Sequence, residues 1–295
     1  MNITLTGSLG NISRPLAERL IREGHQLTII SSNPLKAEAI GQLGAKPAIG
    51  DLSDVGFLTQ TFKGADAVFA MIPTDMTSAD MDSDILKIGW AYDAAIRIAQ
   101  VKHVVLLSSI GADQAAGTGP VKALHQVEHF FQKMEDVTVT ILRAGFFYYN
   151  YYRDIPIIRS MGIMGGNYPG DSVLPLVHPK DIADSVAESL TGSRNGKEVK
   201  YIVSDIYTSG EIALLLGASI DKDSLQWSVF ADQQVHDAIT NAGLSASVAD
   251  GYTEMGSAIG SGLMSADFFT SGAPVKGRRK FTDFVTEFSI KYNAS

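Results

Sequence analysis

Two glycines follow the first apolar run of the chain at a spacing that suits phosphate binding. Residues 6–13 read TGSLGNIS, directly after the apolar run at residues 2–5 and before the pattern of an amphipathic helix. Gly7 would permit a tight turn, and Gly10 would let the backbone approach a dinucleotide pyrophosphate at the helix N-terminus. The third glycine of such turns is replaced by Ser13, a small residue that helix-to-strand packing tolerates. The pattern predicts a working dinucleotide loop.

The end of the second apolar run selects between NAD and NADP. A carboxylate there would accept hydrogen bonds from the NAD ribose and repel the extra phosphate of NADP. This chain instead has Ser31, Ser32 and Asn33, with Lys36 one turn further on. Two hydroxyls, an amide and an ammonium group could hold a phosphate, so these residues favour NADP, with NAD still possible. The alternative is that they form only a turn before a helix begun by Pro34.

Strand-like and helical patterns alternate through the first half of the chain. Apolar strand-like runs occupy residues 3–6, 26–30, 46–50, 65–72, 103–109 and 137–143, and helical periodicity separates them. Such alternation predicts an α/β fold: a Rossmann-type, doubly wound parallel sheet covered on both faces. We expect an NAD(P)-binding Rossmann domain at residues 1–145. Residues 146–295 should form a smaller mixed α/β substrate-binding lobe, not an independent domain, from which strands return to the sheet.

Aromatic residues are concentrated at the start of that second lobe. Residues 146–152 read FFYYNYY, and they could line a pocket for a flat aromatic substrate, with Phe147 and Tyr149 as the first candidates. The alternative is that these rings pack the second lobe or form a dimer surface. Further on, Asp181 follows Pro179 at a predicted helix start, where a negative charge interacts well with the helix dipole.

The order and spacing of these pieces resemble the NmrA-like family of atypical short-chain dehydrogenases/reductases, including its quinone oxidoreductase-like branch, over nearly the whole length. TGSLGNIS is similar to that family's T-G-x-x-G-x-x-G, LLSSIGAD to the end of its fifth strand and LRAGFFYYNY to its sixth. The resemblance implies a Rossmann domain with a small second lobe and a bound NADP or NAD. It implies cofactor contacts at Gly7, Leu9, Gly10, Asn11, Ile12, Ser32, Asn33, Lys36, Asp51, Leu52, Ala70, Met71 and Ile72.

The catalytic pair of ordinary short-chain dehydrogenases, a Tyr with a Lys four residues on, is absent. The helix that should carry it reads GPVKALHQVEHFFQ, and Leu124 stands where related reductases place the Lys. His125 could donate a proton near neutral pH, or it could be an ordinary hydrogen-bonded residue. Ser108 and Ser109 end a strand without nucleophile-elbow glycines, which argues against a hydrolase and favours contact of Ser108 with the nicotinamide side.

Composition excludes several other functions. The chain has 295 residues, a net charge of -8 and no cysteine, so disulfides, thiolate nucleophiles and cysteine metal sites are excluded. His125 and His129 form a helical pair without a readable third ligand, so we expect no metal. KGRRK at 276–280 is the only basic run and is read as a solvated loop, so we expect no nucleic-acid partner. Without a leader or a long apolar run, we expect a cytoplasmic protein with no membrane partner, possibly a homodimer.

Together these observations predict an NAD(P)H-dependent oxidoreductase that reduces a small quinone or carbonyl compound such as an aldehyde. The cofactor would deliver the hydride without a Tyr/Lys pair, because a quinone needs little help with protons. The alternative is a non-catalytic NAD(P)-binding redox sensor or regulator. A nucleotide-sugar epimerase is a third possibility, disfavoured by the same missing Tyr.

Overall fold

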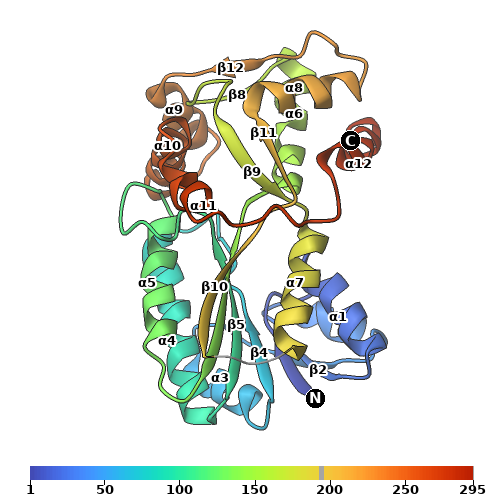
Figure 1. The fold of residues 1–295 in the computed structure, drawn as a ribbon, viewed down its shortest axis with the longest axis vertical. Helices are drawn as coiled ribbons and strands as arrows, with labels where there is room; N and C mark the ends of the chain where they lie inside the picture. Colours follow the sequence, from blue (N-terminus) through green and yellow to red (C-terminus); the bar gives the residue numbers. More distant parts are fainter. Residues whose placement is uncertain (193–195, 295) are drawn as a thin grey trace.

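A seven-stranded parallel sheet forms the centre of the computed structural model, which describes residues 1–192 and 196–294 (Figure 1). Its strands lie in the order β10-β6-β5-β4-β1-β2-β3, so the winding direction reverses between β1 and β4. The strands are β1 (Asn2–Leu5), β2 (Gln26–Ser31), β3 (Lys46–Ile49), β4 (Ala67–Ala70), β5 (His103–Ser109), β6 (Thr138–Ala144) and β10 (Lys197–Ile202). The expected Rossmann-type fold is confirmed, and ligands of such sheets bind at the carboxyl ends around the reversal.

Helices cover both faces of this sheet. One face carries α1 (Ser13–Arg22), α2 (Ala37–Gln42) and α7 (Pro179–Thr191), and the other carries α3 (Val55–Phe62), α4 (Met81–Ala99) and α5 (Val121–Gln132). Helix α1 buries Leu16 and Leu20, which are one turn apart and fully inaccessible to solvent. Each such leucine contributes about 2 kcal/mol by burial. The apolar stripe of α1 therefore fixes the helix whose N-terminus carries the glycine turn.

The second lobe is built from short strands and an aromatic core. Three strands, β7 (Phe146–Phe147), β9 (Val173–Val177) and β11 (Asp205–Thr208), form one sheet, and β8 (Met164–Gly166) pairs with β12 (Trp227–Val229). The helices are η2 (Tyr148–Asp154), α6 (Ile155–Met161), α8 (Ser209–Ala218), α9 (Asp232–Asn241), α10 (Ala246–Gly260), η3 (Leu263–Ser265), α11 (Ala266–Thr270) and α12 (Phe281–Ala294). Phe281, Phe284 and Phe288 of α12 are buried in the core of this lobe.

The second half of the chain also contributes to the main sheet. Strand β10 pairs in parallel with β6, in a register that places Val199 beside Ile141. Helix α7 packs against α1, and the two lie side by side in Figure 1. The division at residue 145 stays a prediction, because residues on both sides of it build the same sheet. Within residues 1–192 and 196–294, no helix is long and apolar enough to cross a bilayer.

Two side chains of the basic run at 276–280, Arg279 and Lys280, are bound to the protein rather than solvated. Arg279 Nη1 lies 2.5 Å from Asp181 Oδ1 and 2.8 Å from Asp184 Oδ2. Asp181 is 4% exposed and also accepts a hydrogen bond from Ser204 Oγ at 2.7 Å. The expectation of a solvated loop is therefore wrong at Arg279. Asp181 lies in the first turn of α7 as expected, and it additionally anchors the segment that leads to α12.

Candidate cofactor site

The glycine turn between β1 and α1 has the geometry that a phosphate-binding loop requires. Gly7 has a φ of +86°, and a Cβ there would lie 2.8 Å from Ser13 Oγ and 2.9 Å from Met71 Cε. Only glycine fits this backbone and this space. The first residue before α1 is Ile12, whose side chain does not cap the helix. The Arg14 N–H donates to the Gly10 oxygen at 3.0 Å and Pro15 has no N–H, so among the described residues the Ile12 and Ser13 N–H groups are left for another acceptor. These features fit a pyrophosphate.

Ser13 explains how the turn works without its third glycine. Its Oγ donates a hydrogen bond of 2.9 Å to the backbone oxygen of Thr6, and the residue is 1% exposed. A side chain of this size fills the contact between α1 and β1 and satisfies its own polar atom there. The substitution therefore maintains the close helix-to-strand packing that glycine provides in related turns.

A groove of 480 Å³ opens beside this turn at the carboxyl ends of β1, β2 and β4. Six predicted cofactor residues line it: Gly7, Ser31, Ser32, Asp51, Leu52 and Met71. Four others, Leu9, Gly10, Asn11 and Ile12, form the rest of the turn that leads into α1. Groove-lining residues that we did not predict include Ser8, Ser53 and Lys87. Ser8 could have been predicted because it lies within the glycine turn. Lys87 could not, because it lies on α4, and only the fold brings α4 close to the turn.

The end of β2 presents one buried and one exposed serine. Ser31 is 4% exposed, and its Oγ accepts hydrogen bonds from Ser8 Oγ at 3.0 Å and from the Asn33 N–H at 3.2 Å. Its hydroxyl is thus used to join the two loops. Ser32 is exposed and lines the groove, so its hydroxyl is open to a ligand on this side.

The following turn is also a helix start. Asn33 Oδ1 accepts a hydrogen bond of 2.9 Å from the Leu35 N–H and begins the short helix η1 (Pro34–Lys36). Lys36 ends that helix with an exposed side chain. The turn before a helix begun by Pro34, which was the alternative to a phosphate site, is therefore present. Within the described residues, the side-chain amide nitrogen of Asn33 and the ammonium of Lys36 have no partner.

Two of the expected cofactor contacts, Asp51 and Leu52, lie in the loop after β3. Asp51 Oδ1 accepts a hydrogen bond of 2.8 Å from the Ser53 N–H, and the contacts with Ser53 hold the pKa of Asp51 below its ordinary value. Asp51 is therefore a carboxylate at neutral pH. Gly50 lies flat against Phe57, because a Cβ there would come within 2.6 Å of that ring.

The end of β4 is fixed by hydrogen bonds to its backbone. Thr6 Oγ1 accepts from the Met71 N–H at 2.8 Å, and Tyr92 Oη donates to the Met71 oxygen at 2.8 Å. Ala70 is fully buried, so it can offer a ligand only its backbone, while Ile72 is half-buried just beyond the strand. Burial raises the pKa of Tyr92, which keeps it a hydrogen-bond donor at all ordinary pH values.

The helix that carries the Tyr and Lys of ordinary short-chain dehydrogenases has a different arrangement here. Leu124 is half-buried and packs against the cores of both the Rossmann domain and the second lobe. His125 Nδ1 lies 2.9 Å from the Ala112 oxygen, in the loop after β5. His125 is therefore held by a backbone hydrogen bond, and its role as a proton donor stays a prediction.

A buried polar cluster occupies the inner side of the same helix. Ser108 Oγ donates to Glu128 Oε1 at 2.6 Å, and Arg143 Nη2 lies 2.7 Å from Glu128 Oε2. Ser108 is 4% exposed, so its hydroxyl points into the protein toward α5. Neither Glu128 nor Arg143 was predicted from the sequence as part of the site. The sequence feature that could have indicated this ion pair is Arg143, a single charged residue at the end of an apolar strand pattern.

The two predicted substrate residues lie in different surroundings. Phe147 is half-buried and packs against the core beneath α1 and α7. Tyr149 Oη donates to Glu287 Oε2 of α12 at 3.3 Å, and burial raises the pKa of Tyr149 to about 12. Its ring centroid lies 5.3 Å from that of His178. Neither residue lines the 480 Å³ groove.

His178 is the one histidine of this region that is almost fully buried. Its Nδ1 accepts a hydrogen bond of 3.0 Å from the Lys180 N–H, so Nε2 carries the proton of the neutral ring. That nitrogen lies 3.5 Å from Glu287 Oε1, and burial lowers the pKa of His178. Within the part of the chain that the structure describes, no three His, Asp or Glu side chains are grouped closely enough to hold a metal ion.

The fold and the groove define a Rossmann-type protein with the dinucleotide turn at its switch point. Residues 7–191 match the family described as "NAD(P)H-binding". The chain belongs to this NAD(P)H-binding family, and its resemblance to the NmrA-like, atypical short-chain dehydrogenases/reductases is confirmed.

Solved structures share the fold over nearly the whole chain. The NADPH-dependent quinone oxidoreductase QOR2 of Escherichia coli, complexed with NADPH, has a TM-score of 0.78 and 20% identity and covers 97% of this chain and 99% of its own. The triphenylmethane reductase of Citrobacter sp., complexed with NADP(H), has a TM-score of 0.80 and 18% identity, with 97% and 99% covered. The chain thus shares its fold with both of these proteins.

A curated relative matches a shorter part. The photosystem II assembly factor Ycf39 of Trieres chinensis is 26% identical over 197 residues, which is 64% of this chain and 60% of the relative. The chain therefore spans less than two thirds of that relative's length.

Proposed function

We propose that this protein is an NADPH-dependent oxidoreductase that reduces a small quinone or carbonyl compound. The observation that carries the proposal is the groove at the β1/β4 switch point, which Gly7 and Ser32 line beside the turn whose Ile12 and Ser13 N–H groups have no acceptor among the described residues. The quinone oxidoreductase and the triphenylmethane reductase of the same fold support the class of reaction. The chemistry that NADPH supplies when bound is hydride transfer.

Each part of the groove has a distinct role in this proposal. The turn at Gly7, Leu9, Gly10, Asn11 and Ile12 would hold the pyrophosphate with backbone N–H groups. Asp51 and Leu52 would contact the adenine, and Ala70, Met71 and Ile72 would continue the binding surface along the end of β4. Ser108 would act indirectly on the nicotinamide side, since its hydroxyl is bound to Glu128.

NADP preference is proposed from the side of the groove at the end of β2. Ser32, the amide nitrogen of Asn33 and the Lys36 ammonium offer donors, and no carboxylate from the end of β2 opposes a phosphate there. The Ser31 hydroxyl accepts hydrogen bonds from Ser8 Oγ and from the Asn33 N–H, so these donors start from an ordered loop. NAD would bind the same groove without using these donors.

Substrate orientation is proposed to come from aromatic surfaces rather than from an acid–base pair. Phe147 follows the carboxyl end of β6, the edge at which open α/β sheets bind ligands. Tyr149 would offer its ring face, because its hydroxyl is engaged by Glu287 and its pKa is raised. A quinone, which needs little proton transfer from the protein, fits a site with Leu124 in place of a lysine.

A second candidate, a non-catalytic NAD(P)-binding sensor, is favoured by a specific observation. Leu124, at the expected position of the catalytic Lys, packs between the two lobes and so serves the contact between them, while Tyr149 packs against α12 within the second lobe. In a sensor, the bound cofactor would change the contact between the lobes, and no substrate would be reduced.

The test is NADPH consumption by the purified protein with a panel of quinones and aldehydes. We expect turnover with at least one quinone and none in a Gly10→Asp variant, which places a carboxylate against the pyrophosphate. If the wild-type protein is saturated with NADPH and yet turns over no member of the panel, the sensor replaces the oxidoreductase. Light scattering of the same sample tests the predicted homodimer.

A further inference from the structure

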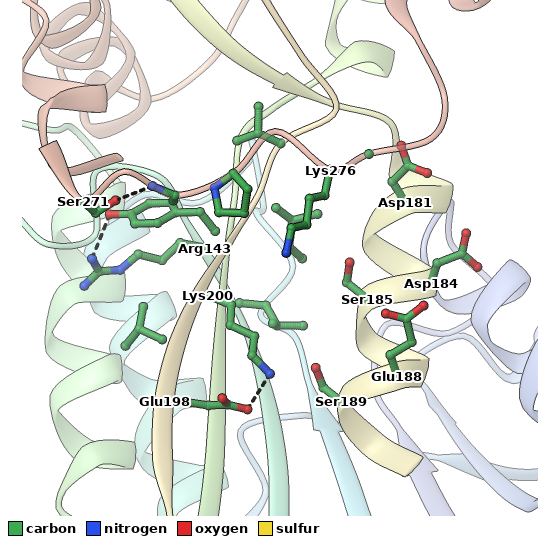
Figure 2. A pocket seen from close by; sticks show the side chains of 18 of the residues that line it. Arg143, Asp181, Asp184, Ser185, Glu188, Ser189, Glu198, Lys200, Ser271 and Lys276 are labelled. Atoms are coloured by element: carbon green, nitrogen blue, oxygen red, sulfur yellow. Dashed lines mark hydrogen bonds and ion pairs between the residues drawn. The ribbon is translucent and has the colours of Figure 1, made fainter. Parts of the chain in front are cut away.

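A second and larger groove lies away from the cofactor groove, between β10, α7 and the segment at residues 271–278 (Figure 2). Its volume is 890 Å³, within the range of about 300–1,000 Å³ that is usual for small-molecule sites. The two grooves share no lining residue. Leu142, Ile202 and Val203 give the larger groove an apolar floor on the face of the sheet.

Every carboxylate that lines this larger groove is paired with a cation. Arg279 binds Asp181 and Asp184, and these contacts raise the pKa of Arg279. The other three pairs are Glu188 with Arg19 at 3.9 Å, Glu198 with Lys200 at 2.6 Å and Asp267 with Arg143 at 3.1 Å. Each carboxylate of the groove therefore has a cationic partner, while Arg279 serves two of them and Arg143 and Arg19 also pair with Glu128 and Glu23.

Two cations of the lining have no such partner. Lys276 and Arg278 are exposed, and within residues 1–192 and 196–294 neither side chain makes a hydrogen bond or an ion pair. Figure 2 shows the Lys276 ammonium directed from the 271–278 segment into the groove. That segment is held in place, because the Lys276 and Gly277 N–H groups donate to the Val203 oxygen at 3.1 and 3.0 Å. The position of Lys276 is thus set by the backbone.

Two hydroxyl groups line the groove from α7. Ser185 and Ser189 lie one helical turn apart on the side of α7 that faces β10, while Asp184 points away (Figure 2). Serines in a helix commonly bond back to the carbonyl four residues earlier, as Thr191 does to Ala187 at 2.9 Å. Among the described residues neither serine hydroxyl has a partner, so both are available as donors.

We propose that this groove binds a small organic oxyanion, a molecule with a phosphate or carboxylate group on an apolar body. The ammonium of Lys276 and the guanidinium of Arg278 would neutralise the charge, and the Ser185 and Ser189 hydroxyls would donate to its oxygens. The apolar part would cover Leu142 and Ile202. The ligand would sit one helix away from α1, since Asp184 of α7 binds Arg19 of α1 at 3.2 Å.

The test uses two probes, inorganic phosphate and citrate, titrated into the isotope-labelled full chain at constant ionic strength while backbone amide shifts are followed by NMR. We expect saturable shifts at Ser185, Ser189 and Lys276. A Lys276→Gln/Arg278→Gln variant should weaken binding at least about fivefold. Lys133→Gln, which removes an exposed lysine outside the groove, should bind as the wild type does. Saturation by phosphate alone indicates a phosphoryl ligand, and saturation by citrate alone indicates a carboxylate.

Three results would overturn the proposal. Shifts confined to residues 7–12 would mean that the anion occupies the dinucleotide turn only. Equal shifts with sodium chloride would mean simple screening of charge. Unchanged binding in the double variant would mean that the two cations are not the receptor. Because the cofactor groove reports at separate residues, failure here leaves the oxidoreductase proposal standing, and the reverse also holds.

Discussion

The Glu128 carboxylate lies 2.7 Å from the Arg143 guanidinium in the closed space between α5 and β6. Their side chains are 3% and 10% exposed, and Ser108 and Tyr201 add hydrogen bonds to the pair. The helix that performs acid–base chemistry in ordinary short-chain dehydrogenases thus carries a buried ion pair here. This pair joins β5, α5, β6 and β10 from the side of the sheet that bears α5.

Removing one member of this pair should be costly. Glu128→Gln would leave the Arg143 charge buried with fewer partners, so we expect the free energy of unfolding to fall by about 3 kcal/mol. Glu128→Leu combined with Arg143→Met should cost less than Glu128→Gln, because no uncompensated charge remains buried: Asp267, which loses Arg143, is 43% exposed. Urea unfolding monitored by circular dichroism measures both. A Glu128→Gln protein within about 0.5 kcal/mol of the wild type would contradict this account.

Alanine variants of Gly7 and Gly24 can distinguish the effect of backbone strain from the effect on cofactor binding. Both have a positive φ, +86° and +85°, but a Cβ at Gly24 would meet nothing within 4 Å. Each change to alanine should cost about 1 kcal/mol from the backbone alone. Only Gly7→Ala should also collide with Ser13 and Met71 and weaken NADPH binding, by at least about tenfold. Fluorescence titration with NADPH checks this, and equal losses of affinity in the two variants would refute it.

Ser32 should decide between the two nucleotides. Ser32→Asp places a carboxylate where we position the extra phosphate, so NADPH affinity should fall about tenfold while NADH affinity holds or rises. The matched control is Ser32→Asn, because asparagine has nearly the same shape as aspartate but carries no charge. Isothermal titration with both nucleotides measures the ratio. Unchanged NADPH affinity in Ser32→Asp would contradict the placement of the phosphate.

Asp154 should make stability depend on pH. Burial raises the pKa of Asp154 to about 7, with Arg153 opposing the shift, and Tyr151 and Tyr168 are neighbours of the carboxyl. The folded state therefore holds a proton that the unfolded state releases near its ordinary pKa of 3.8. The contribution to stability is complete below that value and is lost as the pH rises toward about 7.

Asp154→Asn removes this titration without changing the shape of the side chain. Above pH 7 the variant should exceed the wild type by ~2 kcal/mol, because the wild-type carboxylate is then charged in a largely apolar site. Below pH 4 the two should be equal. Thermal unfolding across this range measures the difference, and a constant gap between the two proteins at every pH would show that Asp154 does not titrate in this way.

Much of the fold was predictable because its signals are local. The apolar runs of β4, β5 and β6 and the helical periodicity between them lie within short windows of the chain, so the parallel sheet followed from them. The glycine turn was predictable for the same reason. Strand β10 was recognisable as a strand, but its pairing beside β6 joins segments far apart in the sequence. Such pairings are decided by how the intervening lobe packs.

The site divides in the same way. The sequence by itself determined which residues could bind a dinucleotide, since the turn, the serines after β2 and the missing Tyr and Lys are visible residue by residue. Only the tertiary structure decided that Ser31 and Ser108 are used internally, that Arg279 is bound by α7, and that Lys276 and Arg278 have no counter-charge. The reason is physical. The availability of a polar side chain depends on which partners the fold brings within hydrogen-bond distance, and those partners come from elements distant in sequence.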